Sequence, residues 1–152
     1  MGAWDVGPFD NDHAADFAAG IQHASGPQER QDIFAITFGA FMDAHEGEFA
    51  GQLEEGYELP SIFEEVIASA AWVADTALGD TGWINTPYAR GVDRDSNELN
   101  PYPEIGEVDG HMVANAHAAL SKALRLMRKA AIGSAWTTEP ERILTALRGA
   151  MG

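Results

Sequence analysis

The sequence contains no cysteine, few basic residues and no long apolar run. Without cysteine there can be no disulfide bond and no thiolate metal site. No stretch approaches the ~18 consecutive apolar residues that a membrane-spanning helix needs. The opening residues lack the basic and apolar regions of a secretory signal, so we expect a cytoplasmic protein that does not enter a membrane.

The charge is unevenly distributed along the sequence. Lysine and arginine together number 9, against 24 aspartates and glutamates, which gives a net charge of −15. Arg30 is the only base among the first 89 residues, which hold sixteen acids, whereas eight bases and eight acids follow from Arg90 onward. Such a surface repels nucleic-acid phosphate and anionic lipid and would attract a basic protein partner. Solubility or adaptation to salt is the simpler explanation of the same acid excess.

The leader, residues 2–17, combines turn residues with large aromatic residues. Gly7 and Pro8 favour a turn, and Trp4 and Phe9 lie on either side of it. Because each aromatic side chain can bury about 150–250 Å², we expect the leader to fold inward and clamp the body of the protein. Six residues of the leader are candidates for binding, although a structural role, such as helix capping by the first polar ones, is the simpler explanation for them: Trp4, Phe9, Asp10, Asn11, Asp12 and Asp16.

The leader also resembles the start of a bacterial family of unknown function, DUF4259, whose members open with M-G-x-W-G-x-G-P-F-x-N-D-x-A-x-D. The matching residues are 1–4, 7–12 and 15–17, and Asp5 stands where the family usually has glycine. Later similarity is loose and consists of an alanine-rich middle helix and the Ser134-x-Trp136 segment. The resemblance implies an all-helical domain and implies no activity.

Five stretches have apolar residues at steps of three and four, which is typical of amphipathic helices. The second stretch is apolar on most sides, so we expect it to be the central helix of the core. No strand pattern and no internal repeat is visible, so the sequence predicts an all-α fold, a single-domain bundle over residues 1–152. The expected helices span about 12–24, 27–47, 61–78 and 110–132, and the last begins near 138.

Polar residues support several of these boundaries. Ser61 and Glu64 have the spacing of a capping box, and Asp109 can cap the fourth helix. We expect residues 138–141 to start the last helix with another capping box, and Trp136 to pack against the body just before it. Three basic residues share a face of the fourth helix that could lie against the acidic half of the chain: Lys122, Arg125 and Lys129.

Residues 79–109 form a long stretch without clear periodicity, and long loops are often functional. We expect Trp83 and Tyr88 to anchor the start of this loop to the core. Four oxygen-bearing residues fall at positions one, three, five and twelve of a calcium-binding loop: Asp93, Asp95, Asn97 and Glu104. The pattern departs from such a loop because Glu98 replaces the required glycine, and two prolines obstruct the exit helix. An acidic surface loop is the alternative.

Two groups of histidines and acids are candidates for a metal site with nitrogen and oxygen ligands. His13 lies beside Asp12 and Asp16, and His45 has acidic neighbours at Asp43, Glu46 and Glu48. Neither group identifies a third ligand, and surface histidines among acids are common in an acidic chain. His117 falls on the apolar stripe of its helix, so we expect it to be a hydrogen-bonded core residue.

Two functions remain open from the sequence. The first is a non-enzymatic protein whose acidic half binds a basic protein partner, as small acidic immunity and antitoxin proteins do by analogy. The second is a metal-dependent enzyme or calcium-binding protein that uses residues 93–104 or the His13 group. No nucleophile, phosphate-binding glycine loop or catalytic motif favours an enzyme.

Overall fold

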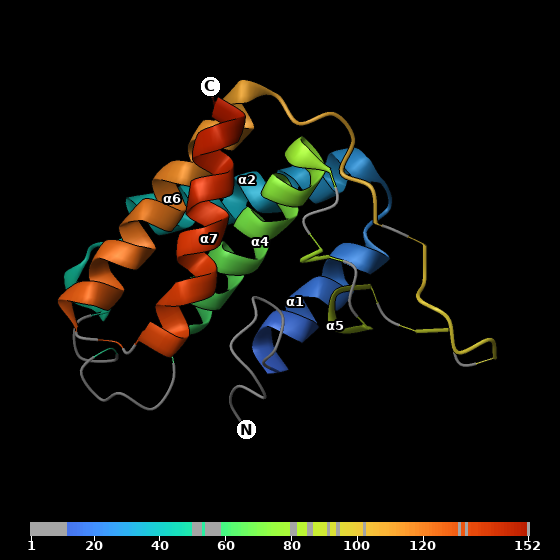
Figure 1. The fold of residues 1–152 in the computed structure, drawn as a ribbon, viewed down its shortest axis with the longest axis horizontal. Coiled ribbons are helices and arrows are strands. Elements are labelled where there is room, and N and C mark those ends of the chain that lie inside the picture. The colour runs from blue at the N-terminus through green and yellow to red at the C-terminus, as the bar shows by residue number, and fades with distance from the viewer. Residues whose placement is uncertain are drawn as a thin grey trace.

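The computed structural model describes residues 12–49, 53, 59–79, 82–84, 87–90, 92–93, 95–101, 103–130, 132 and 134–151 (Figure 1). The fold of these residues is all-α, as predicted, with five long helices and one of four residues. They contain no strand, and Val92 and Leu99 form an isolated bridge. The helices are α1 (Asp12–His23), α2 (Pro27–Asp43), α4 (Ser61–Leu78), α5 (Pro87–Arg90), α6 (Gly110–Lys129) and α7 (Ser134–Met151). None of these helices is both long and apolar enough to cross a membrane.

The central helix is α4, which contacts α1, α2, α6 and α7 (Figure 1). Every residue from 66 to 75 is buried, and many of them are alanines, whose small side chains let neighbouring helices approach from several sides. The prediction that α2 occupies this place was wrong. α2 buries a single side, with Phe34, Phe38 and Phe41, and leaves Ile36 69% exposed on the other.

Aromatic rings fix the position of α2 against α4. The rings of Phe41, Phe49 and Phe63 form a triangle with centroids 5.1–5.6 Å apart. Trp72 of α4 lies 5.8 Å from the ring of Phe34, and its indole N–H donates to the carbonyl of residue 103 at 3.3 Å. Because each aromatic pair adds about 0.5–1.5 kcal/mol beyond its buried area, these contacts favour one arrangement of the two helices.

Lys122 of α6 caps the C-terminus of α2. Its side chain is 9% exposed, and Nζ donates to the carbonyls of Phe41 at 2.6 Å, Ala44 at 2.8 Å and Met42 at 3.3 Å. The last carbonyls of a helix have no partner within it and form the negative end of its dipole, so an ammonium group is stabilised there. The basic face of α6 therefore meets the first half of the chain through backbone carbonyls as well as side chains.

Arg30 holds three segments together at the other end of α2. Its Nε donates to the carbonyl of Ile21 in the last turn of α1 at 2.8 Å, and its Nη1 donates to the carbonyl of Glu104 at 2.7 Å. Gln31 donates to the carbonyls on either side of Gly106. Gly106 has a φ of 72°, which favours glycine. A Cβ there would also lie 3.4 Å from the side-chain nitrogen Nε2 of Gln31. These bonds position the extended segment before α6.

Two helix starts test the predicted boundaries. Asp109 caps α6 as expected, because its Oδ1 accepts the backbone N–H of Met112 at 2.8 Å. The predicted start of α7 was wrong, since the helix begins at Ser134 and contains Pro140. A proline at that position lacks the N–H that would bond to the carbonyl four residues earlier. Thr137 and Pro140 are buried, so packing outweighs the missing bond, and Trp136 is 41% exposed instead of packed.

The predicted loop over residues 79–109 is attached to the core at several points. Ile84, Ala89 and Ile105 are each no more than 1% exposed, and Trp83 packs against the core as expected. The side chain of Tyr88 lies outside the described residues, so its predicted role as an anchor is untested. Residues 92–93 and 95–99 project away from the bundle (Figure 1).

Candidate functional site

The structure describes only part of the predicted leader. α1 begins at Asp12, and Asp16 is exposed on that helix. Four predicted leader residues, and the side chain of Asp12, lie outside the described part of the chain: Trp4, Phe9, Asp10 and Asn11. The inward clamp of the leader on the body therefore remains a prediction.

Three of the four predicted calcium ligands come together in the projecting turn. Asp93 Oδ1 accepts the backbone N–H of Asp95 at 2.8 Å, and the carbonyl of Asp93 accepts the N–H of Asn97 at 2.8 Å. Asn97 has a φ of 60°, a conformation that asparagine tolerates well in a tight turn. Glu104 lies instead in the segment that Arg30 holds, with its side chain exposed. Calcium binding by these residues is not tested by this arrangement.

In each of the two predicted histidine groups, one member contacts a residue from outside the group. His13 Nε2 lies 2.9 Å from Glu65 Oε2 on α4, while Asp16 remains exposed. Glu46 forms an ion pair with Arg125, and the hydrogen bond from Arg125 lowers the pKa of Glu46. Among the residues that the structure describes, no three histidine, aspartate or glutamate side chains are grouped to hold a metal ion.

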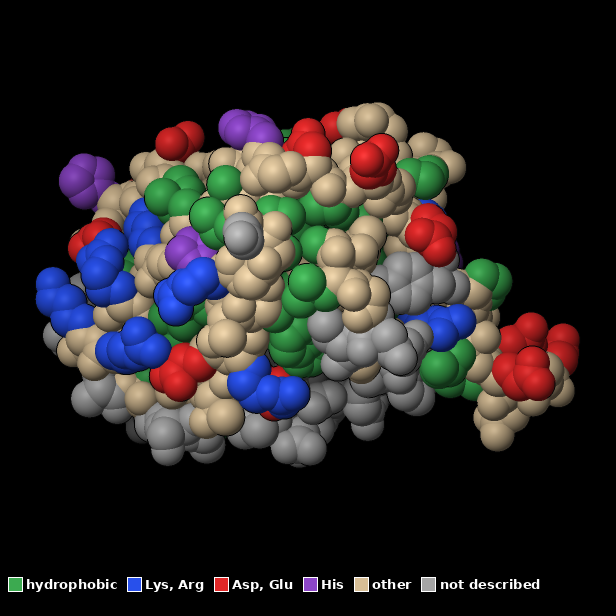
Figure 2. All heavy atoms as spheres, turned by 45° about the horizontal axis from the view of Figure 1, so that its top comes forward, with side chains coloured by type: hydrophobic (Ala, Val, Ile, Leu, Met, Phe, Trp, Pro, Cys, Tyr) green, Lys and Arg blue, Asp and Glu red, His purple; other side chains and the backbone are tan. Residues whose placement is uncertain are grey.

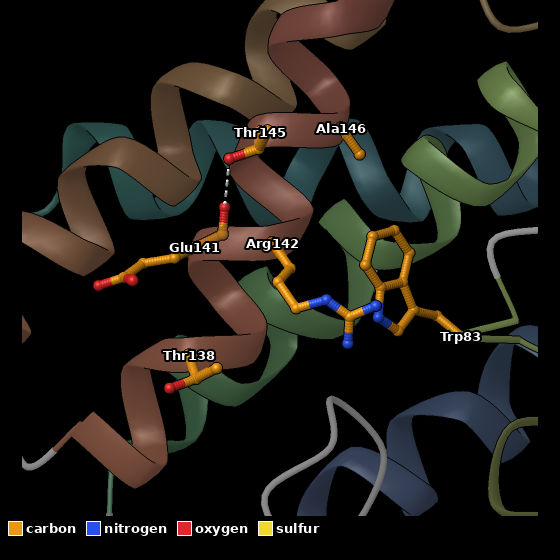
Figure 3. A pocket seen from close by; sticks show the side chains of 6 residues that line it. All are labelled: Trp83, Thr138, Glu141, Arg142, Thr145 and Ala146. Carbon is orange, nitrogen blue, oxygen red and sulfur yellow. Dashed lines mark hydrogen bonds between the residues drawn. The ribbon is translucent and has the colours of Figure 1, made fainter.

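An open groove of about 630 Å³ lies between α7 and the segment at Trp83 (Figure 3). The volume falls within the range of small-molecule sites, which is about 300–1,000 Å³. Figure 3 shows the guanidinium of Arg142 directed at the indole of Trp83, while Glu141 points away from it. The other residues that line the groove are Thr138, Thr145 and Ala146.

Two of the residues that line the groove, Trp83 and Arg142, both bond to Glu139. Glu139 accepts from the indole N–H of Trp83 at 2.9 Å and from Arg142 Nη1 at 2.5 Å. The guanidinium carbon of Arg142 also lies 6.0 Å from the centroid of the indole, a cation–π distance. Thr145 donates to the carbonyl of Glu141 at 3.0 Å. The arrangement therefore fastens the Trp83 segment to α7.

We expected His117 of α6 to be a hydrogen-bonded core residue. Its Nε2 is buried and has no hydrogen-bond partner among the described residues, although the residue as a whole is only partly buried. Burial lowers the pKa of His117, and the nearby positive charge of Arg148 lowers it further. The folded protein therefore favours the neutral imidazole.

We expect His117 to make the protein less stable as the pH falls below about 6.5. The unfolded chain then takes up a proton on this histidine that the folded chain resists, so the free energy of unfolding decreases. His117→Leu should reduce this decrease and raise the stability at pH 7.5 by about 1 kcal/mol, because it removes an unsatisfied buried nitrogen. Urea unfolding at pH 5.5 and 7.5 measures both effects. The exposed His111→Leu is the control, and an equal pH response in both variants would contradict the expectation.

Charged side chains of opposite sign gather in different parts of the surface (Figure 2). Lysines and arginines lie together over the α6 and α7 side, and the end that projects furthest from them is acidic. Several bases on α6 and α7 are paired within the chain, including Arg128 with Glu141 at 2.8 Å. The side chains of three exposed acids of the first half form no hydrogen bond or ion pair with the described residues: Asp16, Asp43 and Glu48.

Sequence reasoning missed the groove at Trp83 and the exposed side of α2. The bond between Trp83 and Glu139 joins residues 56 positions apart, and no local pattern predicts such a contact. The apolar residues of α2 were identified from the sequence, but those on its solvent side were also expected to be buried in the core.

Comparison with known proteins gives one match. No curated protein and no solved structure is similar enough to the chain to count as a match. The sequence model described as "Domain of unknown function (DUF4259)" matches residues 2–130, which include α1, α2, α4, α5 and α6 and exclude α7. Because this match covers most of the 152 residues of the chain, the chain belongs to the DUF4259 family.

Proposed function

We propose that this chain is a non-enzymatic interaction protein that binds a basic protein partner in the bacterial cytoplasm. The observation that carries the proposal is the set of exposed acids on the first half of the chain that no described residue neutralises, with Asp16, Asp43 and Glu48 as examples. Opposite charge on a partner would accelerate its association and favour it over acidic competitors.

The bonds made by the basic residues support this proposal. Lys122 and Arg30 donate to backbone carbonyls, and Arg125, Arg128 and Arg142 bind carboxylates of the same chain. These cations stabilise the fold locally, and of the first-half acids Arg125 neutralises Glu46, while Asp16, Asp43 and Glu48 have no counter-charge among the described residues. The acid excess is therefore concentrated where a partner could reach it.

The test is to isolate partners on the immobilised chain, identify them and measure the affinity of the purified pair by calorimetry. We expect a basic partner whose dissociation constant rises at least about tenfold between about 50 and about 300 mM salt, because salt screens exposed charges. The triple substitution Asp16→Asn, Asp43→Asn and Glu48→Gln should weaken binding by a similar factor. Glu104→Gln with Glu107→Gln, two exposed acids of the second half, is the matched control.

Three outcomes would refute this function. The chain could retain no basic partner, or bind one with an affinity that does not change with salt, or bind equally well after the triple substitution. If the triple variant instead precipitates at lower concentration than the control, the acid excess serves solubility.

A further inference from the structure

α2 carries apolar residues on its solvent side as well as on its core side. Ile36 is 69% exposed and Met42 is 45% exposed. Ala35, Gly39 and Ala40 lie beside them and are also exposed. A Cβ at Gly39 would meet no atom within 4 Å, so the middle of this surface is uncovered. We call these five residues the outer face of α2.

This pattern differs from that of an ordinary surface helix. A helix that is covered on one side normally carries polar residues on the other, and its apolar residues form a single stripe. α2, which lies at the back of the bundle in Figure 1, has a buried stripe against α4 and α6 and a second apolar stripe that is exposed to solvent. Single exposed apolar residues are common, but a continuous face of them marks a contact surface. Its small residues would let the backbone of a partner helix approach closely.

Acidic residues lie at both ends of the outer face. At 100° per residue, Asp32 and Asp43 fall on the same side of α2 as Ile36, one before the face and one after it. Both are exposed. The single basic residue of α2, Arg30, directs its guanidinium to backbone carbonyls at 2.7–3.4 Å. The outer face therefore has an apolar centre, acidic ends and no positive charge of its own.

These charges argue against a second copy of the chain as the occupant. Two copies of α2 packed antiparallel about the middle of the face would bring Asp32 of each copy toward Asp43 of the other. A parallel arrangement would bring each acid against its own equivalent. Like charges that are brought together at an interface are unfavourable, so neither arrangement is stable.

We infer that the outer face of α2 docks an amphipathic helix of a basic protein. Small apolar residues of that helix pack against Ile36, Gly39 and Ala40, and a lysine or arginine at each end pairs with Asp32 and Asp43. The two acids are eleven positions apart, so the two cations are about 16 Å apart on the partner. This inference rests on the proposed function and names the surface and the kind of segment that binds.

The probe is a synthetic helical peptide with an alanine and leucine stripe and two lysines eleven positions apart. Titrated into the full-length ¹⁵N-labelled chain, it should shift backbone signals of α2 and few others. Ile36→Ser should weaken its binding about tenfold, which corresponds to losing the burial of one aliphatic side chain. Leu78→Ser is the control, because Leu78 is 47% exposed on a different helix and should leave the affinity unchanged.

The outcomes separate this inference from the proposed function. If the peptide binds in a salt-dependent way but shifts signals outside α2, the docking surface is wrong and the acidic function stands. If a peptide with glutamates in place of the lysines binds α2 equally well, the face docks apolar helices and its preference for a basic partner is wrong. A dimer in sedimentation that Ile36→Ser dissolves would identify a second copy as the occupant and overturn the inference, as would no binding by either peptide.

Discussion

A chain that ends at residue 130 will fail to fold under conditions in which the full-length chain is folded. The family match ends there, but α7 packs along both α6 and α4 and buries Ile143 and Leu147 completely. Removing α7 would expose the apolar sides of α4 and α6. Domains are usually stable by only ~5–15 kcal/mol, so we expect the loss of this buried apolar area to unfold the shortened chain. Circular dichroism and urea unfolding of the shortened chain measure the result.

Single substitutions in α7 give a graded form of the same test. Leu147→Ala should lower the free energy of unfolding of the full-length chain by about 2–5 kcal/mol, because it leaves a cavity among α4, α6 and α7. Met151→Ala is the control in the same helix, since Met151 is 51% exposed and its truncation should cost less than about 0.5 kcal/mol. A shortened chain with a cooperative transition near that of the full-length chain would show that α7 is dispensable.

The second large effect is expected from Lys122→Met, which should destabilise the fold by about 2–3 kcal/mol. Methionine keeps much of the length of the side chain but cannot donate to the carbonyls at the C-terminus of α2. Those carbonyls then lose a charged hydrogen-bond donor at a buried position, since Lys122 is only 9% exposed. The stabilisation of the helix dipole of α2 is lost as well. Urea unfolding at neutral pH measures the change.

Lys129→Met is the matched control for this substitution. Lys129 lies on the same helix and is exposed, so the change should alter stability by less than about 0.5 kcal/mol. If Lys122→Met were as stable as the control, the cost of burying the ammonium would cancel its three bonds, and the cap would contribute nothing to stability.

Local patterns in the sequence predicted the helices well where apolar residues and capping residues agreed. α1 was expected over 12–24 and spans Asp12–His23, and Asp109 caps α6 as its position suggested. α7 shows where local rules fail. A capping-box pattern indicated a helix start at residues 138–141, but the burial of Thr137 and Pro140 against the bundle extends the helix back to Ser134. Tertiary packing supplied more free energy there than the proline removed.

The surfaces on which the proposals rest were harder to predict. The outer face of α2 has the composition of a buried helix, and only the position of α4 shows that this side meets solvent. The bond from Trp83 to Glu139 joins distant parts of the chain, and so do the bonds from Lys122 to the end of α2. Contacts between distant residues leave no periodic signal in either partner.

The sequence by itself determined the helical fold, the net charge of −15 and the absence of disulfides, because these depend on local periodicity and on composition. The tertiary structure decided which helix is central, which apolar face remains exposed and which cations are bound internally. These depend on how several helices share a limited buried volume. Neighbouring helices can pack around the alanine-rich α4 on many sides. They cannot pack around α2 in the same way, because two exposed aspartates lie on its open side.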